Sequence, residues 1–498
     1  MSDTLGEPTG TTPSVARDES HERHRQGTRQ LFLARCCLFV SAYVVAAILA
    51  RKLGSTDYGV YGVVISVLLW LEMVATAGVP GATARLLAGG RSDPADVERS
   101  SRAILLTISV LLLVALWFLA PGIARLMRIP DGATVFRIAA LDLPFAALCA
   151  SYDGVLYGRR RFGTLAQALV LFAFVKVGGV LALMAWGLTV ERVLAVTVAS
   201  TFALSAILAI RCRIGGFRPR WNVVRDVAVL AVPLALFLIA SQILVNLDLW
   251  SLQSLWLGGG DVVGQYVAAA NLARILMVVP AAQAGVLFAS VAWALASREG
   301  GQARQHVQEA TRFALVIAVG ANVVLAWDAA DILSLLFSSP YAGGQPFLRM
   351  LLIGFGLFTL LDVFATALMA AGRQWLVSLA VTAVVPIVWL SNVLLIPRLG
   401  PIGAATTMVL GMAIAATSIG AITYRRFGSV LEWPTLWRVF LAAAVVALTG
   451  ISVQVQGALL LGKVALLGAL YLAVLYWSGE ITAGDFRSPL ESARQPSA

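Results

Sequence analysis

The feature that most constrains this chain is a series of apolar runs that recurs from Leu31 to Trp477. A helix needs about 20 mostly apolar residues to cross the ~30 Å hydrocarbon core of a bilayer. Only 13% of the residues are charged, whereas ~25% is usual in a soluble domain. The sequence therefore predicts an all-α polytopic membrane protein. About fourteen transmembrane helices are predicted, at residues 31–50, 59–84, 103–123, 134–157, 163–187, 192–211, 227–256, 264–294, 310–330, 347–371, 374–396, 401–423, 437–453 and 457–478.

Basic residues fall mainly on one side of the predicted membrane. If the N-terminus is cytoplasmic, 25 of the 37 Lys and Arg residues lie in cytoplasmic segments, as the positive-inside rule requires. We therefore expect both termini to be cytoplasmic. The net charge of +11 then reflects membrane orientation, and no nucleic-acid partner is predicted. The four cysteines have neither the spacing of a disulfide framework nor that of a metal site.

One short phrase occurs twice, as LGSTDYGVY at 53–61 and as LGGGDVVGQY at 257–266. Each copy follows one apolar run and precedes another. Two further pairs keep the same spacing, Pro80 with Pro280 and Gly158 with Gly372, so that the three offsets are 204, 200 and 214 residues. This near-constant offset indicates an internal duplication.

Six helices in each copy, an even number, give both copies the same orientation in the membrane, so they are parallel repeats. Two such bundles around a central cleft form the architecture of a transporter. The predicted divisions are a disordered cytoplasmic tail (1–30), an N-lobe (31–211), a basic cytoplasmic linker (212–226), a C-lobe (227–423), two extra C-terminal helices (424–478) and a cytoplasmic tail (479–498).

Several blocks resemble the polysaccharide-transporter branch of the multidrug/oligosaccharidyl-lipid/polysaccharide (MOP) exporter superfamily, which includes Wzx-type flippases. The blocks stretch over most of residues 31–423 in the family's order. They are ILARKLGSTDYGVYGVV (48–64), AGVPGATARLLA (77–88), LGGGDVVGQYVAAANLARI (257–275), DILSLLFSSPYAGGQPFLRML (331–351) and NVLLIPRLGPIGAATTMV (392–409).

The resemblance implies a MATE-like MOP fold. It also implies a flippase that moves undecaprenyl-diphosphate-linked oligosaccharide across the bacterial cytoplasmic (inner) membrane, for O-antigen (lipopolysaccharide), capsule or exopolysaccharide biosynthesis. The implied partners are that lipid-linked substrate, membrane lipids and polysaccharide polymerase or assembly proteins. Such a step needs a protein, because every unpaired sugar hydroxyl in hydrocarbon costs several kcal/mol.

Three basic residues lie inside predicted spans and are candidate substrate-binding residues: Arg274, Lys176 and Arg35. Arg274 and Lys176 lie roughly 15–20 Å along their helices, too deep for easy snorkelling. A charge at that depth is costly, so it should face a cleft or a partner. The functional interpretation is a contact to an anionic diphosphate or acidic sugar, and the alternative is a structural ion pair. Arg35 is near its helix end, where snorkelling serves equally well.

Four acidic residues lie near the middle of predicted spans: Asp248, Glu72, Asp362 and Asp142. In a secondary transporter such carboxylates can carry a coupling H⁺ or ligate Na⁺, so both ions are candidates. Asp248 lies at a depth similar to that of Arg274 on the next helix, and simple pairing of the two is the alternative. No other cofactor and no metal site is predicted.

The chain has no GxxxxGK[ST] phosphate loop and no HExxH or GxSxG motif. We therefore expect a transporter and not an enzyme. The alternatives on the same fold are a lipid II flippase and a MATE-type drug or cation antiporter. A membrane glycosyltransferase or polymerase is disfavoured, because the longest predicted outside loop, around 331–346, is short and has only Asp331 as a catalytic acid.

Overall fold

The structure is a computed structural model. It describes residues 13–89, 93–159, 161–212, 219–428, 430–452, 455, 457 and 459–481, with only the backbone described at 13–28 and at 281. All regular secondary structure in these residues is helical, as the sequence predicts. Thirteen of the described helical segments are long and apolar enough to cross a membrane.

The first helices are α1 (Pro13–Thr76), α2 (Val79–Gly89), α3 (Pro94–Leu126), α4 (Gly132–Ala140), α5 (Asp142–Gly158), α6 (Phe162–Leu183), α7 (Val190–Cys212) and α8 (Trp221–Leu255). The remainder are α9 (Gly260–Ala273), the 3₁₀ helix η1 (Arg274–Met277), α10 (Val278–Ala296), α11 (Gly300–Trp327), α12 (Ala329–Phe337), η2 (Ser339–Gly344), α13 (Gln345–Ala370), α14 (Gln374–Leu399), α15 (Pro401–Phe427), α16 (Trp433–Ser452) and α17 (Leu459–Trp477).

The thirteen segments overlap all fourteen predicted spans, because the first segment, Arg29–Gly89, holds the first two. Within α1 the backbone of Gly54 has φ 81° and ψ 168°, which divides the element into two helices. Glycine adopts this positive φ without a steric penalty. Gly54 of the first repeated phrase therefore marks the division between the two predicted spans.

The predicted tails differ from the structure in part. Where disorder is predicted over 1–30, α1 already begins at Pro13. A helix is reasonable there because residues 14–30 contain no proline and a single glycine. Residues 1–12, 213–218 of the predicted linker and 482–498 of the C-terminal tail lie outside the described residues.

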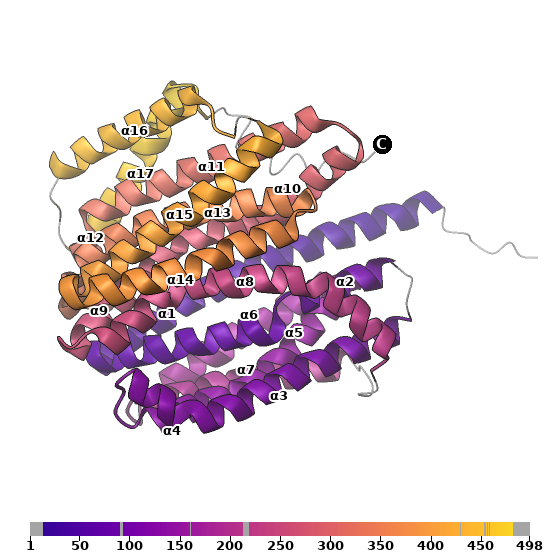
Figure 1. The fold of residues 1–498 in the computed structure, drawn as a ribbon, viewed down its shortest axis with the longest axis horizontal. Coiled ribbons are helices and arrows are strands. Elements are labelled where there is room, and N and C mark those ends of the chain that lie inside the picture. The colour runs from indigo at the N-terminus through magenta and orange to yellow at the C-terminus, as the bar shows by residue number, and fades with distance from the viewer. Residues whose placement is uncertain are drawn as a thin grey trace, which may run out of the picture. The chain divides into compact units, whose positions relative to one another are not determined.

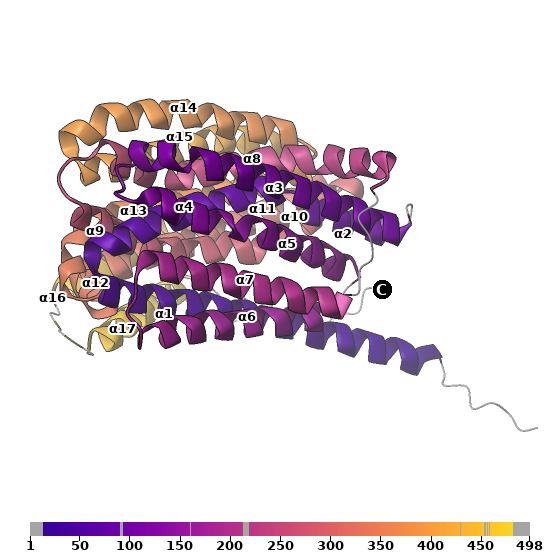
Figure 2. The same ribbon diagram turned by 90° about the horizontal axis from the view of Figure 1, so that it is seen from below.

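The chain forms two compact units, of which the first consists of Met1–Ala46, Ala75–Phe118 and Arg137–Val232. Helix α5 is central to this unit, where it contacts α2, α6 and α7 (Figure 2). One apolar cluster joins α1 to α5, α6 and α7 around Tyr152 and Leu165. A second joins α2 and α3 to α5 and the start of α8 around Val97 and Val227.

The second unit consists of Ala47–Val74, Leu119–Phe136 and Pro233–Ala498. Its core is α13, which packs against α10, α11 and α15 (Figure 1). In the span that contains α13, 78% of the apolar window is buried, the largest share among the described spans. An apolar helix surrounded by other helices is buried on all sides, so α13 forms the interior of this unit.

The two copies of the repeated phrase pack against each other within the second unit. A Cβ atom added at Gly264 would lie 1.8 Å from the backbone oxygen of Ser55, and one added at Gly59 would lie 2.9 Å from the backbone nitrogen of Gly264. Only glycine permits such an approach of two backbones. Residues 47–74 of the first sequence repeat therefore belong to the same compact unit as the second repeat.

The last two helices, α16 and α17, dock on α11. Val439 and Val446 of α16 and Leu467 of α17 form a buried apolar cluster with α11 residues. The hydroxyl of Tyr471 on α17 donates a hydrogen bond to the backbone oxygen of Val316, at 2.9 Å. The role of these helices was not evident in the sequence, and their packing makes them part of the second unit.

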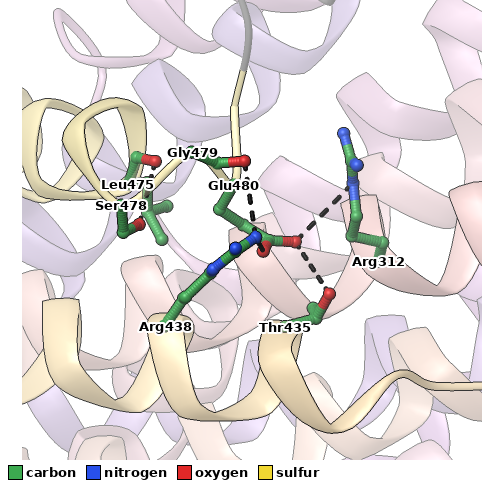
Figure 3. A network of polar contacts seen from close by, with 7 residues as sticks. All are labelled: Arg312, Thr435, Arg438, Leu475, Ser478, Gly479 and Glu480. Carbon is green, nitrogen blue, oxygen red and sulfur yellow. Dashed lines mark hydrogen bonds and ion pairs between the residues drawn. The ribbon is translucent and has the colours of Figure 1, made fainter.

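A buried carboxylate holds one end of this helix pair (Figure 3). Glu480 is 2% exposed, although the sequence places it in a cytoplasmic tail. Thr435 donates a hydrogen bond to Oε1 of Glu480 at 2.9 Å, and Arg438 donates one to Oε2 at 3.2 Å. Nε of Arg312, on α11, lies 3.8 Å from Oε1. The end of α17 is thereby joined to α16 and α11.

The other end of the pair is held by an ion pair. Nζ of Lys463 lies 2.8 Å from Oδ1 of Asp328 and 3.1 Å from the backbone oxygen of Gly450. The side chain of Lys463 is 3% exposed and that of Asp328 is 11% exposed. A charged group removed from water to this extent needs its partner.

Replacing Lys463 by methionine should therefore destabilise the protein by about 3–5 kcal/mol, because it leaves a buried charge without a partner. The double variant Lys463→Met/Asp328→Asn should recover most of that loss. Thermal unfolding in detergent measures both. The control is Lys52→Met, at an exposed lysine of the same unit. Equal stability of Lys463→Met and Lys52→Met would contradict the prediction.

Candidate substrate-binding site

The span Gly260–Ala296 is interrupted near its middle. Helix α9 ends where η1 begins at Arg274, and α10 then continues the span. Pro280 has no N–H group to donate to the carbonyl of Leu276 four residues earlier. That carbonyl instead lies 3.3 Å from the hydroxyl of Thr359 on α13, a donor that also lies 3.0 Å from the carbonyl of Phe355 in its own helix. The Thr359 hydroxyl thus reaches the interruption, whose first residue is Arg274.

Replacing Thr359 by valine should cost about 1–3 kcal/mol, because the buried carbonyl of Leu276 then loses its side-chain donor. The control is Thr423→Val. Thr423 is equally buried. Its hydroxyl donates to the carbonyl of Ile419 in its own helix, and that carbonyl keeps its backbone donor when the hydroxyl is removed. A larger stability loss in detergent for Thr359→Val than for Thr423→Val confirms the prediction, and equal losses would refute it.

Arg274 contacts α8. Its Nη2 donates a hydrogen bond to Oδ1 of Asn246 at 2.7 Å. The amide nitrogen of Asn246 in turn donates to the backbone oxygen of Gln242 at 2.8 Å, which orients the amide so that its oxygen accepts. The arrangement holds a half-buried cation in a fixed direction.

Asp248, two residues further along α8, is 2% exposed and contacts α9 instead. Its Oδ2 accepts a hydrogen bond from the hydroxyl of Tyr266, whereas its Oδ1 has no hydrogen-bond partner. The charge of Arg274 acts on Asp248 through space. The two residues are thus electrostatic neighbours, but each makes its hydrogen bond to a different neutral side chain.

Aromatic side chains surround this cluster. Nδ2 of Asn271, one turn before Arg274, donates to the hydroxyl of Tyr58 at 2.9 Å. Tyr58 is fully buried and meets Tyr341 edge to face, with ring centroids 5.8 Å apart. The Tyr341 hydroxyl donates to the backbone oxygen of Ala50 at 2.9 Å. This second unit therefore fixes Arg274 and Asp248 within a rigid aromatic and amide frame.

Of the other predicted acids, Glu72 and Asp362 also lie in the second unit, and both are half-buried. Glu72 lies two residues after Trp70, whose ring packs edge to face on that of Trp250 with the ring centroids 5.6 Å apart. Asp362 lies one turn along α13 from Thr359, the residue whose hydroxyl reaches the interrupted span.

The remaining candidates, Arg35, Lys176 and Asp142, lie in the first unit. Arg35 is exposed, donates a hydrogen bond to the hydroxyl of Tyr157 and lies over its ring at 5.9 Å. Lys176 is half-buried, and its Nζ lies 5.7 Å from the centre of the Phe172 ring. Asp142 is 2% exposed in the first turn of α5.

The arrangement in the second unit is suited to binding an anion. Arg274 provides a half-buried positive charge at a helix interruption, and the half-buried amide of Asn271 lies one turn before it. Within the residues that the structure describes, no group of His, Cys, Asp or Glu side chains has metal-ligand geometry. The chemistry available is recognition of charge and hydrogen-bonding groups.

Solved structures with the same fold are membrane transporters. "Lipid II flippase MurJ, inward closed conformation" superposes with a TM-score of 0.74 and 13% sequence identity, over 92% of this chain and 99% of that chain. An inward-facing multidrug resistance MATE family transporter of the MOP superfamily superposes with a TM-score of 0.65 and 16% sequence identity, over 79% of this chain and 94% of that chain. A MOP superfamily transporter from Pyrococcus furiosus superposes with a TM-score of 0.53 and 15% sequence identity, over 82% of this chain and 95% of that chain. No curated relative matches the sequence.

The chain is therefore a multi-pass membrane protein with the MOP fold, and the solved structures that share this fold are transporters and flippases. The chain belongs to the polysaccharide biosynthesis protein family, whose family model matches residues 25–288, just over half of its length. The resemblance and the fold class predicted from the sequence are both confirmed.

Proposed function

We propose that this protein is a flippase for undecaprenyl-diphosphate-linked oligosaccharide in the bacterial cytoplasmic membrane, with both termini cytoplasmic. It moves repeat units to the outer leaflet for O-antigen, capsule or exopolysaccharide assembly. Transport proceeds by alternating access, in which the polar headgroup passes through the protein while the lipid tail stays in the bilayer. Family membership supports a lipid-linked substrate used in polysaccharide biosynthesis.

The observation that carries the proposal is the environment of Arg274. Arg274 is a half-buried guanidinium at the interruption of a membrane span, and its hydrogen bond to the amide of Asn246 holds it in a fixed direction. A diphosphate carries the charge and the acceptor oxygens that an arginine binds best. Lys176 and Arg35 are further candidate contacts in the first unit.

Energy coupling is proposed to involve a buried carboxylate. Asp248 is the first candidate, because one of its oxygens has no hydrogen-bond partner and is open to H⁺ or Na⁺. Glu72, Asp362 and Asp142 are the further candidates. The proposed partners outside the substrate are membrane lipids and polysaccharide polymerase or assembly proteins.

The function is tested by locating lipid-linked oligosaccharide in the two leaflets after deletion of the gene. An impermeant sugar-oxidising reagent is applied to intact spheroplasts and to opened vesicles. We expect full-length repeat units to be labelled only in opened vesicles, and a plasmid copy of the gene to restore labelling in spheroplasts. Normal labelling in deleted spheroplasts would refute the proposal. Accumulation of lipid II alone would assign the protein to peptidoglycan precursors instead.

A further inference from the structure

An apolar groove runs along α11 between α10 and α17 in the second unit. It has a volume of about 450 Å³. Its lining is apolar except for the Tyr471 hydroxyl, which is engaged with a backbone carbonyl. Val316, Val324 and Leu276 lie along it, and Gly468 of α17 opens one wall. The three helices are all candidate membrane spans, so this groove lies at hydrocarbon depth.

A polar chamber of about 640 Å³ adjoins the groove, because Val316, Ile317 and Leu472 line both. Its polar lining is contributed mainly by α10 and the first half of α11. It consists of Gln283, Ser290, His306, Glu309 and Arg312. Nε2 of Gln283 is buried without a hydrogen-bond partner, so a donor in the chamber lacks an acceptor.

Among the described residues that line the chamber, Glu309 and Arg312 carry charges of opposite sign. Glu309 has a side chain 58% exposed and Arg312 one that is 40% exposed. Glu480 lies between two arginines, Arg312 and Arg438. The outer guanidinium nitrogens of Arg312 point away from Glu480 (Figure 3). The chamber is therefore complementary to a zwitterion and not to a net anion.

The dimensions match one membrane leaflet. From Arg312 to Leu325, the last α11 residue in the groove, a helix rises roughly 20 Å at 1.5 Å per residue. One leaflet contributes about half of the ~30 Å hydrocarbon core. A single acyl chain fits that length, whereas a C55 polyprenyl chain exceeds it several-fold.

We propose that the groove and chamber bind one phospholipid with a zwitterionic headgroup, such as phosphatidylethanolamine. One acyl chain lies in the groove, the phosphate faces Arg312 and Gln283, and the ammonium group faces Glu309. The lipid is a bound structural partner of the second unit, separate from the transported substrate and independent of its identity.

The test uses two matched glycines on α17. A Cβ added at Gly468, in the groove wall, meets no atom within 4 Å, and the same is true at Gly462, which lies outside the groove. Gly468→Phe therefore fills the groove without a backbone clash, and Gly462→Phe adds the same ring elsewhere. Native mass spectrometry of the purified full chain, titrated with phosphatidylethanolamine or phosphatidylglycerol, reports lipid bound per protein.

We expect Gly468→Phe to bind about tenfold less phosphatidylethanolamine, the change that loss of about two buried methylene groups produces, while Gly462→Phe binds as the wild type does. Glu309→Gln, at an exposed position, should reverse the preference toward phosphatidylglycerol. Unchanged binding by Gly468→Phe, or an unchanged preference in Glu309→Gln, would overturn the proposal. Displacement of the phospholipid by equimolar undecaprenyl phosphate would overturn it too, and would assign the groove to the transported lipid.

Discussion

Replacing Gly264 by leucine should abolish export while the protein still inserts into the membrane. A Cβ at this position would lie 1.8 Å from the backbone oxygen of Ser55, and a backbone atom cannot rotate away as a flexible side chain can. Helix α9 must then separate from α1, at a cost of at least about 3 kcal/mol by comparison with overpacked cores. Tyr58 and Tyr266 lie on the separating segments, so the frame around Arg274 and Asp248 is disrupted as well.

Export of surface polysaccharide in a strain lacking the chromosomal gene measures this effect, and thermal unfolding in detergent measures the stability. The matched control is Gly285→Leu, in the same unit, because a Cβ there meets no atom within 4 Å. It should export normally. Wild-type export and stability in Gly264→Leu would show that α1 and α9 do not need this contact.

Replacing Arg274 by alanine should reduce export about a hundredfold, because loss of a desolvated charge contact costs about 2–5 kcal/mol. Arg274→Lys should retain part of the activity, since lysine keeps the charge but loses the planar pair of donors. Membrane abundance should stay near that of the wild type in both variants.

The control is Arg349→Ala. Arg349 is exposed in the same unit, and its Nε donates to the backbone oxygen of Ala326 at 2.7 Å, away from the Arg274 cluster. Export and the amount of lipid-linked oligosaccharide left in the inner leaflet are measured together. Normal export in Arg274→Ala would remove this residue from the binding site, even if the protein is a flippase.

The helical architecture was predictable because hydrophobic length is a local property. Each span is an apolar run of the length that a bilayer requires, and Gly54 at the end of the first run marks a division that the structure confirms. The partners of buried charges are not local. Asp248 and Arg274 have similar depths, which made them candidates for a pair, yet helix rotation directs them to Tyr266 and Asn246 respectively.

The interrupted span shows the same limit. Pro280 predicts a break, but a proline does not show which residue donates a hydrogen bond to the carbonyl that the missing N–H group leaves. Thr359 lies in α13, some eighty residues away in the sequence, and only the packed structure brings it to Leu276. Tyr58 and Tyr266 were also missed as site residues, although they belong to the two repeated phrases. The duplication was the signal that could have identified them.

The contact between the repeated phrases also bears on the origin of the chain. Gly59 of the first copy approaches Gly264 and Gly260 of the second, while Gly264 approaches Ser55 and Gly260 approaches Thr56. Each copy thus uses the same surface toward the other, which is the rule for a two-fold interface between identical subunits. We therefore expect a chain with a single repeat to dimerise through this phrase. Because the contact is intramolecular in this protein, a bulky substitution in either copy also affects the other.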